Sequence, residues 1–492
     1  MGFIKKLFKP IDLTKGTIWK NIIFFSLPIL LSYVFQQIYT IADASICGQY
    51  LNANEVAGVN NTGNITFIVL QFAFGCTAGF SVVTSKAVGC KDEEGIRKSL
   101  AMQIKLSFYV TVILTILAII MINPLLQLIG LTPSDNATQQ EIYQSAYLYI
   151  LVIFIGTFAQ IFYNLICSFL RSVGDSLNPL LFLIFSTVLN IGLDILFITA
   201  FKWGVIGAAV ATVIAQAISA VGCFAFTFIH YKEYRLHFSD FKVDMKSAFN
   251  HLKLGLPLAF QFSILAIGLI VMQGAIVKFD TSVDGVVIQS YAQNGFGAAT
   301  KLNNFLMCPF SALGTAMLSY CGQNLGAGEI NRIKKGVTQS FIIMLIEYAI
   351  FAGIGLLLTI NGAYMYIFYS PDKINEATIH FGNVYLYCDL SLYFILGALF
   401  ILRNSLQGIG KALFPFLAGI GELVARTSIC LILPSLLNGG EVNIYANNAS
   451  LIGLSFADPL AWTFAVSCMI YGMIKYIYKA KQPTNDELKK EN

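Results

Sequence analysis

The sequence predicts an all-α integral membrane protein with twelve transmembrane helices, arranged as two parallel six-helix repeats around a central cleft. Three observations support this prediction: the composition, a series of apolar segments and an internal repeat. The 492 residues are 57% hydrophobic and 12% charged, whereas soluble domains are about 25% charged. Hydropathy windows of about 19 residues separate twelve apolar segments, and each can cross the hydrocarbon core with some tilt. The expected spans are 20–46, 56–83, 99–128, 142–169, 177–199, 205–230, 252–279, 286–318, 337–368, 378–403, 413–436 and 456–478.

The basic residues predict the orientation of these spans. In the loops and at the ends of the expected spans, Lys and Arg gather on one side, as in the 231–251 loop and at Arg403, whereas the other side receives Lys202, Lys278 and Lys373. Because basic loops stay in the cytoplasm, we expect cytoplasmic termini and a multi-pass location in the inner (plasma) membrane. The net charge of +5 then reflects topology and does not indicate nucleic-acid binding.

The second half of the chain repeats the first. Leu27-Pro28 recurs as Leu256-Pro257, AVGCKDEEGIRKSL (87–100) recurs as NLGAGEINRIKKGV (324–337), and LRSVGDSLNP (170–179) recurs as LQGIGKALFP (406–415). Six spans per half is an even number, so both halves enter the membrane in the same orientation, as parallel repeats do. The expected domains are an N-terminal bundle (1–230), a cytoplasmic linker (231–251), a C-terminal bundle (252–480) and a cytoplasmic tail (481–492).

The fifth and sixth spans carry polar side chains that should lie together. Asn190 and Asp194 are four residues apart, so they leave the same face of a helix. Asp194 lies nine residues before Trp203 and Thr212 nine residues after it, so the two share a depth in an antiparallel pair. A charge near the bilayer centre costs about 2.5 kcal/mol or more, which indicates a function for Asp194.

The first span offers a second carboxylate. Gln36, Tyr39 and Asp43 lie on one helix face, and we expect Asp43 to meet Asp194 in the outer half of the first bundle. Two carboxylates, an amide and a hydroxyl can bind a hard cation, and the carboxylates can hold a proton. The alternatives are that Asp43 sits at the water interface and that Asp194 caps a backbone group.

Four segments carry a resemblance to a known family. They are SLPILLSYVFQQIYTIAD (26–43), NPLLFLIFSTVLNIGLDILF (178–197), GVIGAAVATVIAQ (204–216) and SYCGQNLGAGEINR (319–332). Together and in this order they resemble multidrug and toxic compound extrusion (MATE) transporters, nearest to the DinF-like and MepA-like bacterial members.

The resemblance implies a cation site and a transport reaction. It assigns the site to Asp43, Asn190, Asp194 and Thr212, with Na⁺ as the only metal considered there. It implies export of amphipathic, often cationic drugs or metabolites in exchange for inward Na⁺ or H⁺, by rocker-type alternating access. We therefore expect no enzymatic activity and no cofactor besides the coupling ion. The expected partners are the lipid bilayer and a small-molecule substrate, with the protein a monomer.

The second half lacks an equivalent oxygen cluster. At an offset of 236 residues Ser186, Asn190 and Asp194 correspond to Glu422, Arg426 and Cys430. Glu422 and Arg426 are four residues apart and can neutralise each other in the membrane, either as a structural pair or as a substrate contact. Asp389 can bind a cationic substrate or a proton. The candidate substrate-cavity residues are Gln36, Tyr39, Asp389, Glu422 and Arg426.

Two other functions remain as alternatives. A lipid-linked oligosaccharide flippase of the same superfamily needs several basic residues in its cleft, and only Lys301 and Arg426 are available. A membrane-embedded enzyme needs a nucleophile with a base or a metal-ligand set, and the sequence shows neither. It also lacks the GxxxxGK[ST] loop of ATP-driven transporters.

Overall fold

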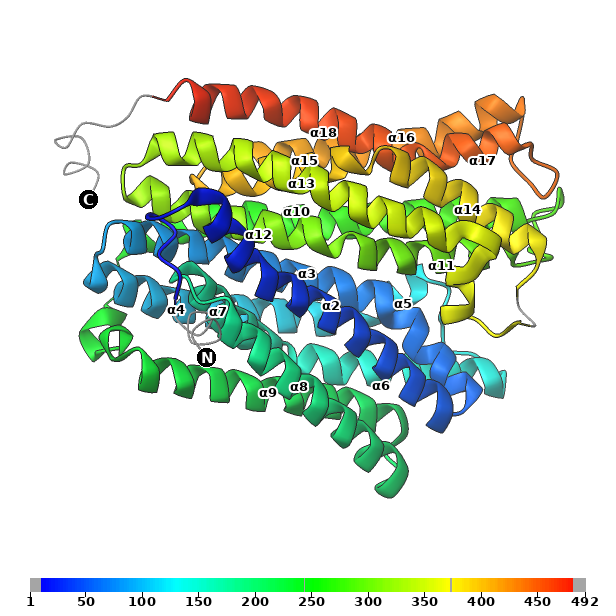
Figure 1. Ribbon diagram of the computed structural model, residues 1–492. Coiled ribbons are helices and arrows are strands. Elements are labelled where there is room, and N and C mark those ends of the chain that lie inside the picture. Colours follow the sequence, from blue (N-terminus) through cyan, green and yellow to red (C-terminus); the bar gives the residue numbers. More distant parts are fainter. Residues whose placement is uncertain (1–9, 243, 372–373, 481–492) are drawn as a thin grey trace. The chain divides into compact units, whose positions relative to one another are not determined.

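The computed structural model describes residues 10–242, 244–371 and 374–480, and its regular structure there is helical (Figure 1). One isolated β-bridge joins Thr281 to Val287. The α-helices are α2 (Ile18–Tyr50), α3 (Ala53–Gly89), α4 (Glu93–Ile120), α5 (Ile122–Leu128), α6 (Ala137–Ile155), α7 (Thr157–Ser172), α8 (Leu177–Ile195), α9 (Gly204–His230), α10 (Met245–Val277), α11 (Tyr291–Leu306), α12 (Cys308–Gly326), α13 (Ile330–Thr359), α14 (Glu376–Ser391), α15 (Tyr393–Gly408), α16 (Leu413–Asn438), α17 (Asn448–Ser455) and α18 (Ala457–Met473). The shorter helical segments are η1 (Leu196–Ala200), η2 (Lys232–Tyr234), η3 (Phe238–Phe241), η4 (Lys278–Asp280), η5 (Ile360–Ile367) and η7 (Ile474–Tyr478).

The helices agree with the prediction of a twelve-span membrane protein. In the described residues, nine helices are long and apolar enough to cross a membrane, and up to twelve if each bent pair is one span. The bent pairs are α6 with α7, α11 with α12 and α14 with α15, at 45°, 41° and 54°. Exposed aliphatic side chains follow one face of α4, namely Ile113, Ile116 and Ile120, as expected of a helix that faces lipid.

The internal repeat is visible in backbone hydrogen bonds. After α3, the amide of Asp92 donates to the Ala87 carbonyl (3.1 Å), and after α12 the amide of Glu329 donates to the Asn324 carbonyl (2.8 Å). The residue before each amide has a positive φ, 57° at Lys91 and 73° at Gly328. This is the bond pattern of a Schellman helix end, so the repeated sequence segments fold alike.

Contacts divide the chain into two compact units. Of the described residues, the first unit contains those up to Gly16 together with Phe24–Ser263 and Ser319–Glu329. The second contains Thr17–Ile23, Ile264–Leu318 and the described residues from Ile330 onward. Two segments of the predicted C-terminal bundle, residues 252–263 and Ser319–Glu329, therefore belong to the first unit by their contacts. The predicted domains follow the sequence repeat instead, and that division stays a prediction.

Part of the predicted linker, 231–251, is helical. Between α9 and α10 the chain forms the short segments η2 and η3, and α10 already begins at Met245. The last seven residues of the 231–251 linker are therefore helical. The predicted tail, 481–492, lies outside the described residues.

Within the first unit, α8 and α9 form an antiparallel hairpin that positions the candidate site (Figure 1). The chain reverses at Lys202 and Gly204, which have positive φ values of 56° and 57°. Fully buried Ile150 and Phe154 of α6 pack in one apolar cluster with Ala209 of α9. This packing holds α6 and α9 together, so residues on α6 can approach the polar face of the hairpin.

Candidate functional site

The four predicted cation-site residues converge within the first unit. Asp43 comes from α2, Asn190 and Asp194 from successive turns of α8, and Thr212 from the first half of α9. Asp194 is 0% exposed and Asn190 is 2% exposed. We call these four residues the carboxylate cluster. The prediction that they lie together is confirmed, whereas their role in binding a cation stays a prediction.

Asn190 connects the two helices of the hairpin. In one orientation its amide Nδ2 donates to Thr212 Oγ1 at 3.3 Å. In the other, the amide nitrogen donates to Asp194 Oδ2 at 2.9 Å, and the amide oxygen accepts from the Thr212 backbone N–H at 3.1 Å. We adopt the second orientation because it satisfies both ends of the amide.

The two carboxylates of the cluster are short of partners. Asp43 and Asp194 interact directly through their side chains. Each nevertheless keeps a buried Oδ1 atom without a hydrogen-bond partner. In the part of the chain that the structure describes, neither forms an ion pair. An ionised buried carboxylate without a counter-charge is costly, so the cluster has the chemistry of a site that takes up a cation or a proton.

The donor set favours a hard cation or a proton over a transition metal. No group of three or more His, Cys, Asp or Glu in the described residues could hold a metal ion. The cluster instead combines two carboxylates with the neutral oxygens of Asn190 and Thr212, and hard cations prefer oxygen ligands. The Tyr39 hydroxyl adds a further oxygen, 3.3 Å from Thr212 Oγ1.

Two residues near the carboxylates were not predicted from the sequence. Tyr149 of α6 and Cys47 of α2 both interact electrostatically with Asp43 and Asp194. Cys47 lies one turn after Asp43, so helical spacing could have identified it. Tyr149 lies in an apolar segment with other tyrosines, and no pattern in the sequence distinguishes it.

Of the predicted cavity residues on α2, only Tyr39 joins the cluster. Gln36 is exposed, and its backbone carbonyl accepts a hydrogen bond from Thr40 at 3.0 Å. No described contact links the Gln36 side chain to Asp43 or Asp194.

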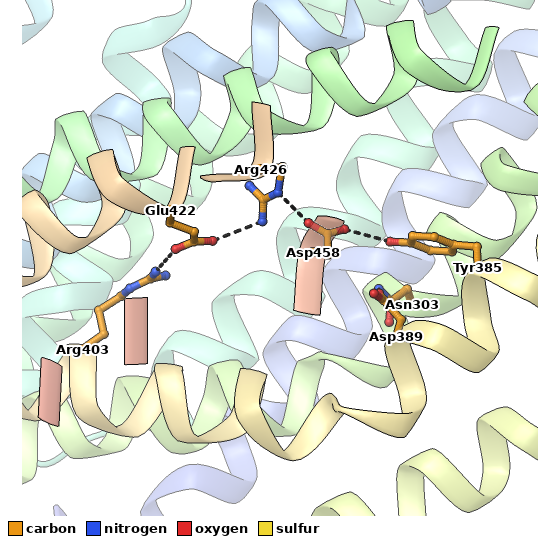
Figure 2. A network of polar contacts seen from close by, with 7 residues as sticks. All are labelled: Asn303, Tyr385, Asp389, Arg403, Glu422, Arg426 and Asp458. Atoms are coloured by element: carbon orange, nitrogen blue, oxygen red, sulfur yellow. Dashed lines mark hydrogen bonds and ion pairs between the residues drawn. The ribbon is translucent and has the colours of Figure 1, made fainter. Parts of the chain in front are cut away.

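The second unit contains a different polar network (Figure 2). Glu422 accepts from Arg426 Nη2 at 3.1 Å and from Arg403 Nη2 at 2.8 Å. Arg426 Nε also donates to Asp458 Oδ1 at 2.6 Å, and Tyr385 donates to the other oxygen of Asp458 at 3.2 Å. The predicted Glu422–Arg426 pair is confirmed, while Arg403 and Asp458 are additional members.

Arg403 corrects one part of the orientation argument. The sequence places it at the end of the tenth span and counts it with the basic residues that face the cytoplasm. In the structure its side chain is 4% exposed and paired with Glu422. Its charge is neutralised inside the second unit, so it does not belong with the solvated basic residues.

Asp389 is the carboxylate of Figure 2 with an unsatisfied oxygen. Its Oδ2 accepts from Asn303 Nδ2 at 2.7 Å. Its Oδ1 and the Asn303 Oδ1 are both buried without a partner. Asp389 lies near the end of α14, before the bend to α15. Whether it contacts a substrate stays a prediction.

Comparisons with known proteins agree on one family. The MatE family model matches residues 28–196 and 280–432. The chain is 24% identical over 489 residues to YoeA of Bacillus subtilis (strain 168), which is named "Probable multidrug resistance protein YoeA", and the match covers 96% of each of the two proteins. It is 25% identical over 327 residues to a protein of Shewanella oneidensis named as an FAD transporter, covering 65% of this chain and 68% of that one. The fold matches an outward-facing multidrug resistance MATE transporter with a TM-score of 0.80, at 19% identity and over 95% of this chain and 98% of that one.

Proposed function

Because the chain belongs to the MatE family of transporters, we propose that it is a secondary active antiporter. In this proposal it exports amphipathic, often cationic drugs or metabolites in exchange for inward Na⁺ or H⁺. The relative YoeA, whose name indicates multidrug resistance, supports drug-like substrates. The observation that carries the proposal is the pair of carboxylates, half-buried Asp43 and buried Asp194, each with a buried oxygen that lacks a partner.

Two such carboxylates can couple ion entry to substrate exit. When ionised and empty, the pair carries two like charges in a buried site, which is unfavourable. A Na⁺ ion or protons entering from outside relieve this repulsion and stabilise the conformation that holds them. Release toward the cytoplasm restores the repulsion. A ligand that binds one of two conformations more tightly shifts their equilibrium, and this difference can drive alternating access.

We assign the basic side of the spans to the cytoplasm, with both termini there and the protein in the inner (plasma) membrane as a monomer. The support for the orientation is the asymmetric distribution of Lys and Arg between loops. Arg403 is excluded from that count because it is buried and paired. The remaining asymmetry is unaffected, since the other side still carries only Lys202, Lys278 and Lys373.

An anionic cargo is the second candidate, because one relative is named as an FAD transporter and a flippase would bind a pyrophosphate. The second unit argues against it. Arg403 and Arg426 are both buried and already paired with Glu422 or Asp458. The Lys301 ammonium lies over the rings of Phe368 and Tyr369, 5.6 and 5.4 Å from their centroids. The two arginines are therefore neutralised by carboxylates. Lys301 keeps its charge, because aromatic rings do not neutralise an ammonium, but one cation is fewer than the several basic residues that a pyrophosphate requires.

Flux measurements in proteoliposomes test the proposal. Uptake or efflux of a monovalent cationic dye is measured under a Na⁺ gradient alone and under a pH gradient alone, with FAD as the anionic comparison. We expect one of the two gradients to drive dye transport, and FAD not to move. Dye transport that responds to neither gradient, or FAD transport in place of dye transport, would overturn the proposal.

A further inference from the structure

Two helix ends from different repeats meet through a pair of glycines. A Cβ atom added to Gly89, at the end of α3, would lie 1.9 Å from the Gln323 carbonyl oxygen. A Cβ atom added to Gly326, at the end of α12, would lie 2.0 Å from the Lys86 carbonyl oxygen. Any side chain at either position would collide with backbone, so this approach requires glycine on both sides. We call Lys86, Gly89, Gln323 and Gly326 the glycine contact; all four belong to the first compact unit.

The glycine contact is reciprocal. Gly89 meets the residue three positions before Gly326, and Gly326 meets the residue three positions before Gly89. Gly89 and Gly326 are equivalent in the sequence repeat, 237 residues apart, and so are Lys86 and Gln323. The same surface therefore occurs on both partners, as in a two-fold symmetric interface between subunits. The Cys90 thiol adds a hydrogen bond to the Gly326 carbonyl at 3.1 Å.

The N-terminal segment reinforces this contact. The Leu13 backbone donates to Gln323 Oε1 at 3.2 Å, and its carbonyl accepts from Asn324 Nδ2 at 3.2 Å. Gln323 Nε2 also donates to the Ser172 carbonyl at 2.8 Å, and Leu13 is 0% exposed. The end of α12 is thus connected to both the N-terminal segment and the end of α7.

We propose that the glycine contact is a latch that closes the cytoplasmic entrance and must separate in each transport cycle. This inference rests on the proposed function, because alternating access requires the helix ends on each side to part in one of the two states. The contact lies at the ends of α3 and α12 next to the basic loops, on the side that we assign to the cytoplasm. Backbone packed on backbone leaves no flexible side chain to absorb a partial movement, so the contact is either formed or broken.

Substitution by alanine tests the latch. Gly326→Ala and Gly89→Ala overpack the closed state and leave an open state unaffected. We expect each to shift the closed-to-open ratio by about tenfold or more, which is the effect of overpacking a close contact. The matched control is Gly353→Ala in α13, where an added Cβ would meet nothing within 4 Å.

The readout is the accessibility of the Cys90 thiol, retained as the only cysteine, to a polar maleimide. Labelling in detergent is compared with labelling of denatured protein. We expect faster labelling in both glycine variants than in the control, which should match the parent. Equal labelling in all three variants would overturn the latch. Because this measurement needs no transport, it remains valid if the coupling proposal fails.

A cross-link keeps the inference testable if the glycine variants do not fold. Ala327 is the repeat equivalent of Cys90 and follows Gly326. In an Ala327→Cys variant that keeps Cys90 as its only native cysteine, a short bis-methanethiosulfonate holds the contact closed: each of the two thiols forms a disulfide with the linker and displaces methanesulfinate. We expect dye transport to stop after cross-linking and to return when a cleavable linker is cut. Full transport by cross-linked protein would overturn the latch.

Discussion

Replacing Asp194 by asparagine removes one charge from the carboxylate cluster and keeps the shape of the side chain. Asp194 is 0% exposed, and an isosteric amide preserves its packing. The pair of carboxylates is expected to exchange more than one positive charge for each cationic substrate. We therefore predict that Asp194→Asn abolishes ion-driven dye export in a protein that still folds.

The expected size of the effect follows from the charge balance. If one cation enters for each monovalent dye that leaves, the charges cancel and voltage does no work. If two enter, one net charge crosses the membrane, and 100 mV supplies about 2.3 kcal/mol. At about 1.4 kcal/mol per tenfold ratio, this voltage alone sustains a dye gradient of roughly 50-fold. Asp194→Asn removes one of the two carboxylates that hold the ions, so coupling fails and this voltage-driven gradient should vanish together with the rest of ion-driven export.

The assay measures dye accumulation and reversal potential in proteoliposomes with an imposed potassium diffusion potential. Thermal unfolding and size-exclusion profiles of the same preparations show whether the variant is folded. Full voltage-driven accumulation by a folded Asp194→Asn variant would refute the role of Asp194. Electroneutral exchange by the parent protein, indifferent to voltage, would refute the stoichiometry.

Three further predictions concern single side chains. Thr212→Ala should weaken the Na⁺ or pH dependence of transport, whereas Cys430→Ala at the repeat position of Asp194 should not; equal shifts would contradict a site confined to the first unit. Arg426→Leu should cost about 3–5 kcal/mol of stability, because it breaks buried ion pairs. Thermal unfolding measures this loss, and the control Lys98→Gln should change it little because the Lys98 ion pair is exposed. Tyr231→Phe should cost about 1–3 kcal/mol by removing a 2.6 Å hydrogen bond to a buried carboxylate; unchanged unfolding would show that water replaces it.

The spans and the carboxylate cluster could be predicted because both depend on patterns along single helices. Apolar length defines the spans, and the four-residue spacing of Asn190 and Asp194 defines a shared face. The short turn at Trp203 then sets the depth of Thr212 on the returning helix. These are local relations, so a sequence contains them directly.

The polar network of the second unit could be predicted only in part. Glu422 and Arg426 lie one turn apart on α16, and their pair follows from spacing. Asp458 and Arg403 reach them from α18 and α15, and such contacts depend on how helices pack. A sequence without aligned relatives holds no signal for that packing, and Arg403 at a span end instead resembles an ordinary interfacial arginine.

The two repeats use equivalent positions of α8 and α16 in opposite ways. Asn190 and Arg426 correspond, and both are buried, yet Asn190 is next to an unpaired carboxylate whereas Arg426 is paired twice. An ion pair lowers the free-energy cost of burying a charge. A charge that is already paired also responds less to an ion that enters the site. The first unit keeps that cost, which is unexpected unless selection maintains the unpaired charge for function. By the same reasoning, Asp389 is better suited than Glu422 to bind a cation in the second unit, because Asp389 Oδ1 has no partner, whereas both Glu422 oxygens accept from arginines.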